Sequence, residues 1–415
     1  MSRLLETLVP ARLGSGYRWL LASSWTTNLG DGLAMAAGPL LVASLTDDAF
    51  LVSLAALLRW APPLVFGLYA GALSDLLDRR LVVMAANGAR AVVLTVLVVS
   101  MLTGTVSVTV ALVALGLLST AEVFADNTSA TLVPMLVSRD DLAVANSRLL
   151  AGLITFDQLA GPPIGAALFA AGTAWPFVTE AVLVAVGVLL VSRIVLPTHG
   201  RGHGDTSGVR QGIVEGVRWA VRHPAVRTLI LTILIFNVTF GAAWSVLVLY
   251  ATRRLGLGAI GFGLLTTVSA AGGLLGVTMY GWLTRRVSLG NIMRVGLVIE
   301  TLTHLALALT TSPWVASAIF FVSGAHAFIW GTTSLTIRQR AVPTHLQGRV
   351  NSVNTIGVFG GLVVGSAIGG LLATHYGVTA PFWFAFGGSV VFLVLLWREL
   401  TRIAHADQQP HTSPA

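Results

Sequence analysis

The sequence of 415 residues contains no cysteine and no lysine, and only 10% of its residues are charged. Without cysteine the chain can form neither a disulfide nor a thiolate metal site. Without lysine it cannot complete a GxxxxGKS/T phosphate-binding loop, so the sequence gives no support to ATP hydrolysis. The 25 basic residues are therefore all arginine, and against 17 acidic residues they give a formal net charge of +8.

Apolar residues dominate the rest of the sequence. They make up 55% of the chain and give a mean hydropathy of +0.83, which places it among membrane proteins. A membrane-spanning helix needs about 20 mostly apolar residues. The chain is therefore predicted to be an all-α membrane protein without strands. Its twelve predicted spans are 18–45, 50–74, 81–102, 106–127, 147–171, 174–196, 226–250, 258–283, 290–311, 314–336, 350–373 and 379–400.

The positions of the arginines predict the orientation in the membrane. If the N-terminus is cytoplasmic, the outside turns hold only Arg253 and Arg254, in agreement with the positive-inside rule. Both termini are then cytoplasmic, in a prokaryotic cell membrane crossed many times. Because this topology explains the basic charge, no nucleic-acid partner is expected. The first span lacks a small-residue cleavage site and is expected to be retained.

A polar stretch after the sixth span divides the predicted helices into two groups of six. Val209, Ile213, Val217 and Val221 recur every four residues there, which predicts an amphipathic surface helix or a solvated linker helix. The predicted parts are an N-terminal six-helix bundle 1–196, a cytoplasmic linker 197–225, a C-terminal six-helix bundle 226–402 and a cytoplasmic tail 403–415.

The two halves also resemble each other. GPPIGAAL at 161–168 is matched by GSAIGGLL at 365–372, each shortly after a predicted loop. Internal repeats of this kind are common in secondary transporters, whose central site lies between halves that rock against each other. Chance similarity between apolar helices rich in glycine and alanine is the alternative.

The stretch GALSDLLDRR, residues 71–80, places four charged residues between two apolar segments. It resembles the loop between helices two and three of the major facilitator superfamily, whose pattern is roughly GxxxDRxGRR. The residues that match are Gly71, Asp75, Arg79 and Arg80, and those that depart are Leu76 and Asp78. The runs STAEVFADNTSATLVP and QGRVNS resemble the branch with macrolide-efflux proteins and the enterobactin exporter. The resemblance covers Trp19 to Trp397 and implies two pseudo-symmetric six-helix bundles.

In that superfamily this loop is a cytoplasmic latch. The resemblance implies that Asp75 faces the N-terminus of the eleventh helix, near Arg349, where the helix dipole stabilises a carboxylate. It also implies that Arg79 reaches an acid of the fourth helix, where Glu122 and Asp126 lie near the cytoplasmic side. A solvated turn whose arginines only set the topology is the alternative.

The fifth predicted helix carries a second family-like motif, DQLAGPPIGA. Its residues Gly161, Pro162 and Gly165 match the antiporter signature GxxxGPxxGG, whereas Asp157 and Ala166 replace glycines. Small residues permit close helix approach, and the prolines bend the helix. The resemblance to this signature implies export of a substrate coupled to proton uptake.

Charged side chains at bilayer depth cost at least ~2.5 kcal/mol each, so they are candidate functional groups. Asp31 is the first candidate proton carrier, with Asn28 one turn away and Arg59 nearby on the second helix. A permanent structural pair of Asp31 with Arg59 is the alternative. The other proton-coupling candidates are Asp157 and the pair Glu300 and His304 on the ninth helix.

Aromatic and polar residues of the C-terminal half could bind an amphipathic ligand. They are Asn237, Phe240 and Trp244 on the seventh helix and His326 and Trp330 on the tenth. Helix packing or interfacial placement is the more frequent role of such aromatics. With Asn28, Asp31 and Arg59 these residues form the predicted substrate cavity. No cluster of metal ligands and no nucleophile motif occurs in the sequence.

These observations favour a proton-coupled exporter of hydrophobic or amphipathic small molecules that works by alternating access. Its expected partners are the substrate, protons and the lipid bilayer; it needs no cofactor except the proton gradient, and a monomer is expected. It is not expected to be an enzyme. One alternative is a dedicated exporter or importer of a single metabolite, such as a siderophore or sugar. Another is a membrane receptor or scaffold without transport activity.

Overall fold

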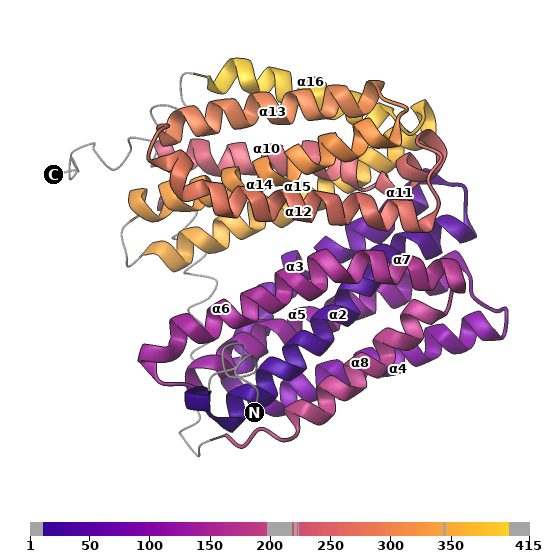
Figure 1. Ribbon diagram of the computed structural model, residues 1–415, viewed down its shortest axis with the longest axis vertical. Coiled ribbons are helices and arrows are strands. Elements are labelled where there is room, and N and C mark those ends of the chain that lie inside the picture. The colour runs from indigo at the N-terminus through magenta and orange to yellow at the C-terminus, as the bar shows by residue number, and fades with distance from the viewer. Residues whose placement is uncertain (1–10, 197–217, 220–221, 223, 343–345, 398–415) are drawn as a thin grey trace. The chain divides into compact units, whose positions relative to one another are not determined.

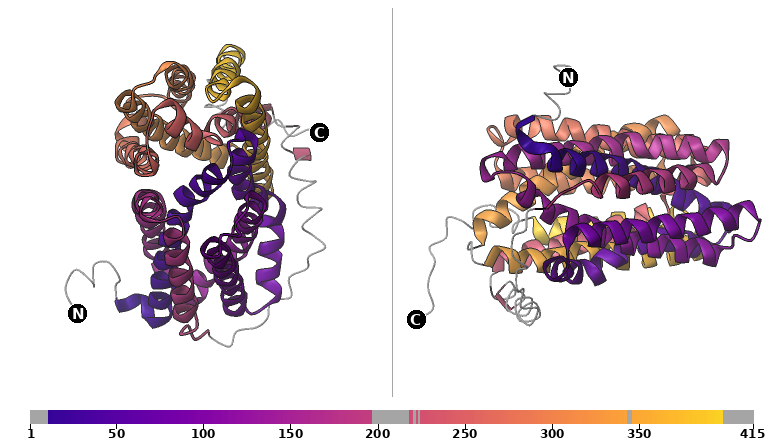
Figure 2. Two further views of the ribbon diagram at one scale, coloured as in Figure 1. Left: turned by 90° about the vertical axis from the view of Figure 1, so that its right-hand side faces the viewer. Right: turned by 90° about the horizontal axis from the view of Figure 1, so that it is seen from below.

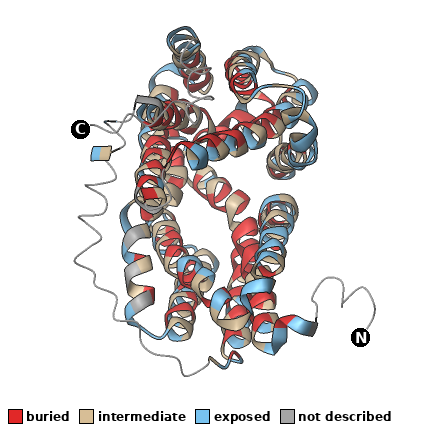
Figure 3. Cartoon of the chain, turned by 90° about the vertical axis from the view of Figure 1, so that its left-hand side faces the viewer, coloured by how far each residue is buried: buried red, intermediate tan, exposed pale blue. Residues whose placement is uncertain are grey.

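The computed structural model describes residues 11–196, 218–219, 222, 224–342 and 346–397. Every regular element in these residues is a helix, as Figure 1 and the further directions of Figure 2 show. The all-α part of the class predicted from composition is therefore confirmed for the described chain. Within it, buried residues gather on the sides of helices that face neighbouring helices (Figure 3).

The helices of the first half follow one another with short connections. In chain order they are α2 (Gly14–Leu45), α3 (Ala49–Leu76), α4 (Arg79–Leu102), α5 (Val108–Leu136), α6 (Leu142–Gly152), the π-helix η3 (Leu153–Ala160), α7 (Gly161–Ala171) and α8 (Trp175–Val191). The last turn of α3 leads directly into α4. Only Leu77 and Asp78 connect the two helices, and Arg79 and Arg80 stand in the first turn of α4.

The second half is built in the same way. Its helices are α10 (Pro224–Trp244), α11 (Leu247–Leu249), the π-helix η4 (Tyr250–Arg254), α12 (Ala259–Thr284), α13 (Leu289–Leu309), α14 (Pro313–Ala341), α15 (Gln347–Tyr376) and α16 (Ala380–Leu396). Nine helices of the described chain are long and apolar enough to cross a membrane. The other three predicted spans, 147–171, 174–196 and 379–400, coincide with helices that are shorter or divided.

The predicted end of the fourth span was wrong. The sequence predicted 106–127, whereas α5 continues to Leu136. The extra turns carry Leu132 and Val133, which are buried in an apolar cluster with Tyr17 and Leu20 of α2. This packing stabilises the turns that follow Asp126 and Asn127, two polar residues that interrupt the apolar pattern in the sequence.

Side-chain capping fixes several helix starts. Asp78 precedes α4, and its carboxylate accepts hydrogen bonds from the backbone N–H groups of Arg80 and Leu81. Ser107, Ser288 and Ser312 cap α5, α13 and α14 in the same manner. Such caps satisfy backbone donors that the first turn leaves free. Asp78, a departure from the family-like loop pattern, therefore has a local structural role.

The structure divides into two compact units. Unit 1 comprises the described residues of 1–47, 58–206 and 257–267, and unit 2 comprises those of 48–57, 207–256 and 268–415. Helices α3 and α12 each contribute to both units. Most of the predicted linker, residues 197–225, lies outside the described residues, as does the tail 403–415. The predicted division of the chain therefore stays a prediction.

Within unit 1, glycines let the broken fifth helix lie directly on α2. A Cβ atom at Gly161 would lie 2.7 Å from the carbonyl oxygen of Phe156 and closer still to the backbone of Gly32. Gly165 lies equally tightly against the backbone of Leu33. The motif residues Pro162 and Pro163 follow η3, whose wider turns replace the α-helical pattern that prolines disrupt. The motif thus builds a close helix contact.

This contact gives a stability prediction with a matched control. Gly161→Ala should destabilise the protein by ~1–3 kcal/mol, because the added methyl group must push two backbones apart. Gly88→Ala on α4 adds the same group where no neighbouring atom lies within 4 Å, so it should leave stability unchanged or raise it by up to about 1 kcal/mol, because alanine favours the helix. Thermal unfolding of the purified variants in detergent measures both. Equal midpoints for the two variants would contradict the packing argument.

Candidate functional site

A buried ion cluster joins three helices of unit 1. Arg90 of α4 donates through Nη2 to Oδ1 of Asp31 on α2, and the same nitrogen lies 3.3 Å from Oε1 of Glu180 on α8. Asn87, one turn before Arg90, accepts from its Nη1 at 3.3 Å. The side chains of Arg90, Asp31 and Glu180 are 5% exposed or less. We call these three residues the Arg90 cluster.

The Arg90 cluster contains two carboxyl groups and one guanidinium. If both acids were ionised, the cluster would carry one net negative charge within apolar helices, which is costly without further pairing. The second oxygen of Glu180 is buried and accepts no hydrogen bond. One proton shared by the two carboxyl groups would make the cluster neutral. The arrangement can therefore bind and release a proton.

The structure brings together residues that sequence analysis did not combine. Asp31 was expected near Arg59, but its ion-pair partner is Arg90. The guanidinium of Arg59 instead lies 5.5 Å above the ring of Trp60, while its backbone oxygen accepts from Ser119. Arg90 carried a usable signal, because it is a charge in the middle of an apolar span. Its partner could not be read from the sequence.

Asp157 lies in η3 and is buried, with 7% of its surface exposed. Its Oδ1 atom has no hydrogen-bond partner. Its backbone oxygen lies 2.5 Å from the place that a Cβ atom at Gly32 would take, one residue after Asp31. Asn28, one turn before Asp31 on α2, donates through its side-chain amide to the hydroxyl of Ser24 at 3.5 Å. Two buried acids are thus carried by helices in close contact.

Away from their arginine-rich end, the described spanning helices of unit 1 carry more acids than arginines. Besides the Arg90 cluster and Asp157, α3 carries Arg59 and α5 carries Glu122 and Asp126. Five acids, Asp31, Glu122, Asp126, Asp157 and Glu180, and two arginines, Arg59 and Arg90, lie along these helices away from the arginine-rich end that carries Arg18, Arg79, Arg80 and Arg148. Glu122 is partly buried and Asp126 is exposed. An excess of this sign favours the binding of protons or of cationic molecules.

Unit 2 contains a second buried titratable cluster. Glu300 of α13 lies 3.0 Å through Oε1 from Nε2 of His304, one turn later, and 3.5 Å through Oε2 from Nδ1 of His326 on α14. All three side chains are at most 3% exposed. An ionised Glu300 needs a proton on one histidine to be balanced, and histidine binds protons near neutral pH. The predicted pair of Glu300 and His304 is thus extended by His326 to a cluster of three titratable side chains.

Stacked aromatic rings continue from this trio along α10. Trp244 meets the ring of His304 edge-on at 6.1 Å and stacks on Phe240 at 4.2 Å. Phe236 stacks in turn on Phe240 and on Trp330, which is only 6% exposed. Asn237 uses its amide to donate to the carbonyl of Ile233. Four predicted cavity residues, Phe240, Trp244, His326 and Trp330, therefore belong to one packed assembly.

The predicted latch is described only in part. Arg79 donates to the carbonyl of Ser74 at 3.0 Å and to the sulfur of Met135 on α5 at 2.9 Å. Arg80 donates to the carbonyl of Ser192 after α8. The side chains of Asp75 and Arg349 lie outside the described residues, and Gly71 lies within α3 with open space around it. The latch stays a prediction.

Comparison with known proteins identifies relatives for nearly the whole chain. The sequence pattern of a family described as transmembrane secretion effectors, a branch of the major facilitator superfamily, matches residues 6–414. A search of curated proteins finds no significant match.

Solved structures of transporters are similar in fold. A variant of the nucleoside transporter NupG has a TM-score of 0.75 and 12% identity, covering 93% of this chain and 99% of its own. A bacterial homologue of the human lysosomal transporter Spinster has a TM-score of 0.71 and 15% identity, covering 97% of this chain and 99% of its own. A bacterial homologue of the iron transporter ferroportin has a TM-score of 0.70 and 17% identity, covering 94% of this chain and 98% of its own. At these identities the likeness shows the fold alone.

The Arg90 cluster predicts an unequal response to two arginine substitutions. Arg90→Met should lower stability by ~3–5 kcal/mol, because it leaves two buried acids without their partner. Adding Glu180→Gln should restore part of the loss, since one acid then becomes neutral. Arg139→Met removes an arginine from an exposed position and should change nothing. Thermal unfolding in detergent tests this order of stability, with Arg90→Met lowest, the double variant intermediate and Arg139→Met unchanged. An unaffected Arg90→Met variant would contradict it.

Proposed function

Because the chain belongs to the transmembrane secretion effector family of the major facilitator superfamily, we propose that it exports hydrophobic or amphipathic small molecules in exchange for protons. The family and the structural neighbours are transporters rather than enzymes. The chain is accordingly a multi-pass membrane protein. The coupling ion, the direction and the substrate class are the proposed part.

The Arg90 cluster carries the proposal. Two carboxyl groups, on Asp31 and Glu180, compete for one guanidinium in a site almost closed to solvent. With a proton on either acid the cluster is neutral, and without it the cluster carries a charge that favours opening to water. Proton binding therefore biases the equilibrium between two conformations, which is what coupling requires.

The excess of internal acids supports a cationic or amphipathic substrate. A positively charged molecule can replace a proton beside Asp126 or Asp157 without leaving an unpaired acid. Competition between substrate and proton for the same negative charge produces exchange in opposite directions. The antiporter-like motif from Asp157 to Gly165 supports export, because it matches the antiporter signature at Gly161, Pro162 and Gly165.

The proposed architecture completes this mechanism. Twelve spans form two six-helix bundles that expose a central site to either side in turn, with both termini in the cytoplasm and the protein acting as a monomer. The trio of Glu300, His304 and His326 is proposed as a second proton-binding site. No cofactor takes part, since the gradient supplies the energy.

Gradient-driven transport tests the coupling role of the Arg90 cluster. In everted vesicles with an acidic lumen, the wild type should accumulate the lipophilic cation tetraphenylphosphonium, and an uncoupler should abolish this accumulation. Asp31→Asn and Glu180→Gln should each reduce it at least tenfold, because the neutral amides cannot release a proton. Exchange of labelled for unlabelled substrate without a gradient should persist in both variants.

The control is Asp140→Asn, which removes an exposed acid from a connection outside the spanning helices and should leave accumulation unchanged. Full accumulation by both cluster variants would reject the cluster as the coupling site. If the folded wild type moved neither this cation nor any of a panel of neutral amphipaths and single metabolites, the receptor or scaffold alternative would be favoured instead.

A further inference from the structure

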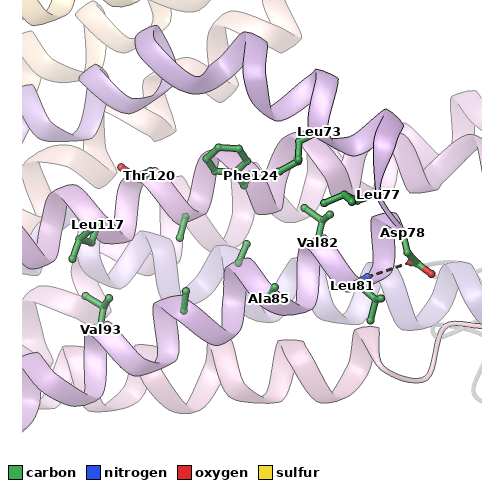
Figure 4. Close-up of a pocket in the computed structure, with 13 residues that line it drawn as sticks. Leu73, Leu77, Asp78, Leu81, Val82, Ala85, Val93, Leu117, Thr120 and Phe124 are labelled. Carbon is green, nitrogen blue, oxygen red and sulfur yellow. Dashed lines mark hydrogen bonds between the residues drawn. The ribbon is translucent and has the colours of Figure 1, made fainter. Parts of the chain in front are cut away.

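An apolar groove of about 600 Å³ lies between α3, α4 and α5 of unit 1 (Figure 4). Its walls include Leu73 of α3, Leu77 just after it, Val93 of α4, and Leu117 and Phe124 of α5. This volume falls in the range of sites for drug-sized ligands. The groove opens to the surface of unit 1, where its lining residues Leu77, Leu81 and Leu117 are more than half exposed. On helices apolar enough to span a membrane, such an apolar surface favours an apolar occupant over water.

One acid lies at one end of this groove. Asp78 stands at the start of α4, opposite the end formed by Val93 and Leu117 (Figure 4). The 15 residues between Asp78 and Val93 correspond to about 22 Å of helix, comparable to a long alkyl chain or several fused rings. Both cap hydrogen bonds of Asp78 use Oδ1. The carboxylate is exposed at the groove's mouth.

The neighbouring arginines do not line the groove. Arg79 directs its guanidinium to Ser74 and Met135, and Arg80 directs its guanidinium to the carbonyl of Ser192. Asp78 is therefore the charged residue in the lining. A carboxylate at the mouth attracts a cationic head group and repels the phosphate of an anionic lipid. The apolar walls accept any apolar tail, so the charge decides between occupants.

We propose that the groove is a docking site for amphipathic cations in the bilayer, with the apolar tail between α3, α4 and α5 and the charged head at Asp78. Its role as a first binding step before export rests on the proposed function, whereas the binding itself does not. By the arginine distribution, the mouth lies at the cytoplasmic leaflet, where exported molecules arrive.

The absence of cysteine makes the test direct. A single Leu77→Cys variant of the full chain places one fluorophore beside Asp78 at the rim, without background labelling. Val113→Cys on α5, with 55% of its surface exposed and outside the groove lining, is the matched reporter. Both proteins are placed in phosphatidylcholine nanodiscs. The probe is a hexadecylammonium amphiphile that carries a nitroxide quencher in its head group.

Quenching at position 77 should saturate, whereas quenching at position 113 should rise in proportion to the probe in the bilayer. Asp78→Asn in the Leu77→Cys background should raise the half-saturating concentration at least threefold, because asparagine keeps the cap but lacks the charge. Ala86→Trp, which fills the groove, should remove the saturable part. A hexadecylphosphate probe with the same nitroxide should show no saturation.

Equal quenching curves at the two reporters would mean simple partition into the bilayer and would overturn the groove as a site. Saturation by the anionic probe, or an unchanged curve with Asp78→Asn, would overturn the choice of a cationic occupant. The measurement is made without a gradient, so it is independent of pumping. If the wild type failed to accumulate the cation in everted vesicles while quenching at position 77 still saturated, the proposed function would be rejected and the docking site would stand.

Discussion

A charge buried among apolar helices has to be paired or neutralised, and this constraint shapes the first unit of the protein. Arg90 lies between Asp31 and Glu180, so one guanidinium serves two acids. The pairing holds α2, α4 and α8 together, and the surplus acid leaves a place for a proton. Under the proposed function the same contacts also carry the proton, so that a change of protonation alters the forces between three helices.

Close backbone packing allows the rest of unit 1 to place its acids. Gly32, next to Asp31 in the sequence, lies against the backbone of Phe156 and Asp157 in η3, and Gly161 continues the contact. A side chain at either glycine would separate α2 from the fifth helix. Unit 2 relies on aromatic stacking instead, in which Trp244, stacked on Phe240, lies edge-on against His304 of the buried trio. Each titratable cluster is thus enclosed by a different kind of packing.

Most features of the fold could be predicted from the sequence, but the pairing of residues in the candidate site could not. Apolar segment lengths predicted helices throughout, and the motifs from Gly71 and from Asp157 predicted the superfamily that the comparison of the whole chain supports. A structural pair of Asp31 with Arg59 was the alternative to a proton-carrier role for Asp31, but the ion-pair partner of Asp31 is Arg90. The sequence predicted Glu300 and His304 as a pair, because they are one turn apart on the same helix. It did not predict that His326 joins them, because His326 comes from α14.

The sequence by itself determined the helical membrane class, the predicted orientation and the chemical types of the internal groups. These are local properties: hydropathy over about 20 residues, arginine between spans, acids within them. Only the tertiary structure decided which charges meet, since Asp31 and Glu180 lie 59 and 90 residues from Arg90 along the chain. Helix rotation and crossing set such meetings, and they depend on packing between distant helices, as at Gly32 and Gly161, that no single segment encodes.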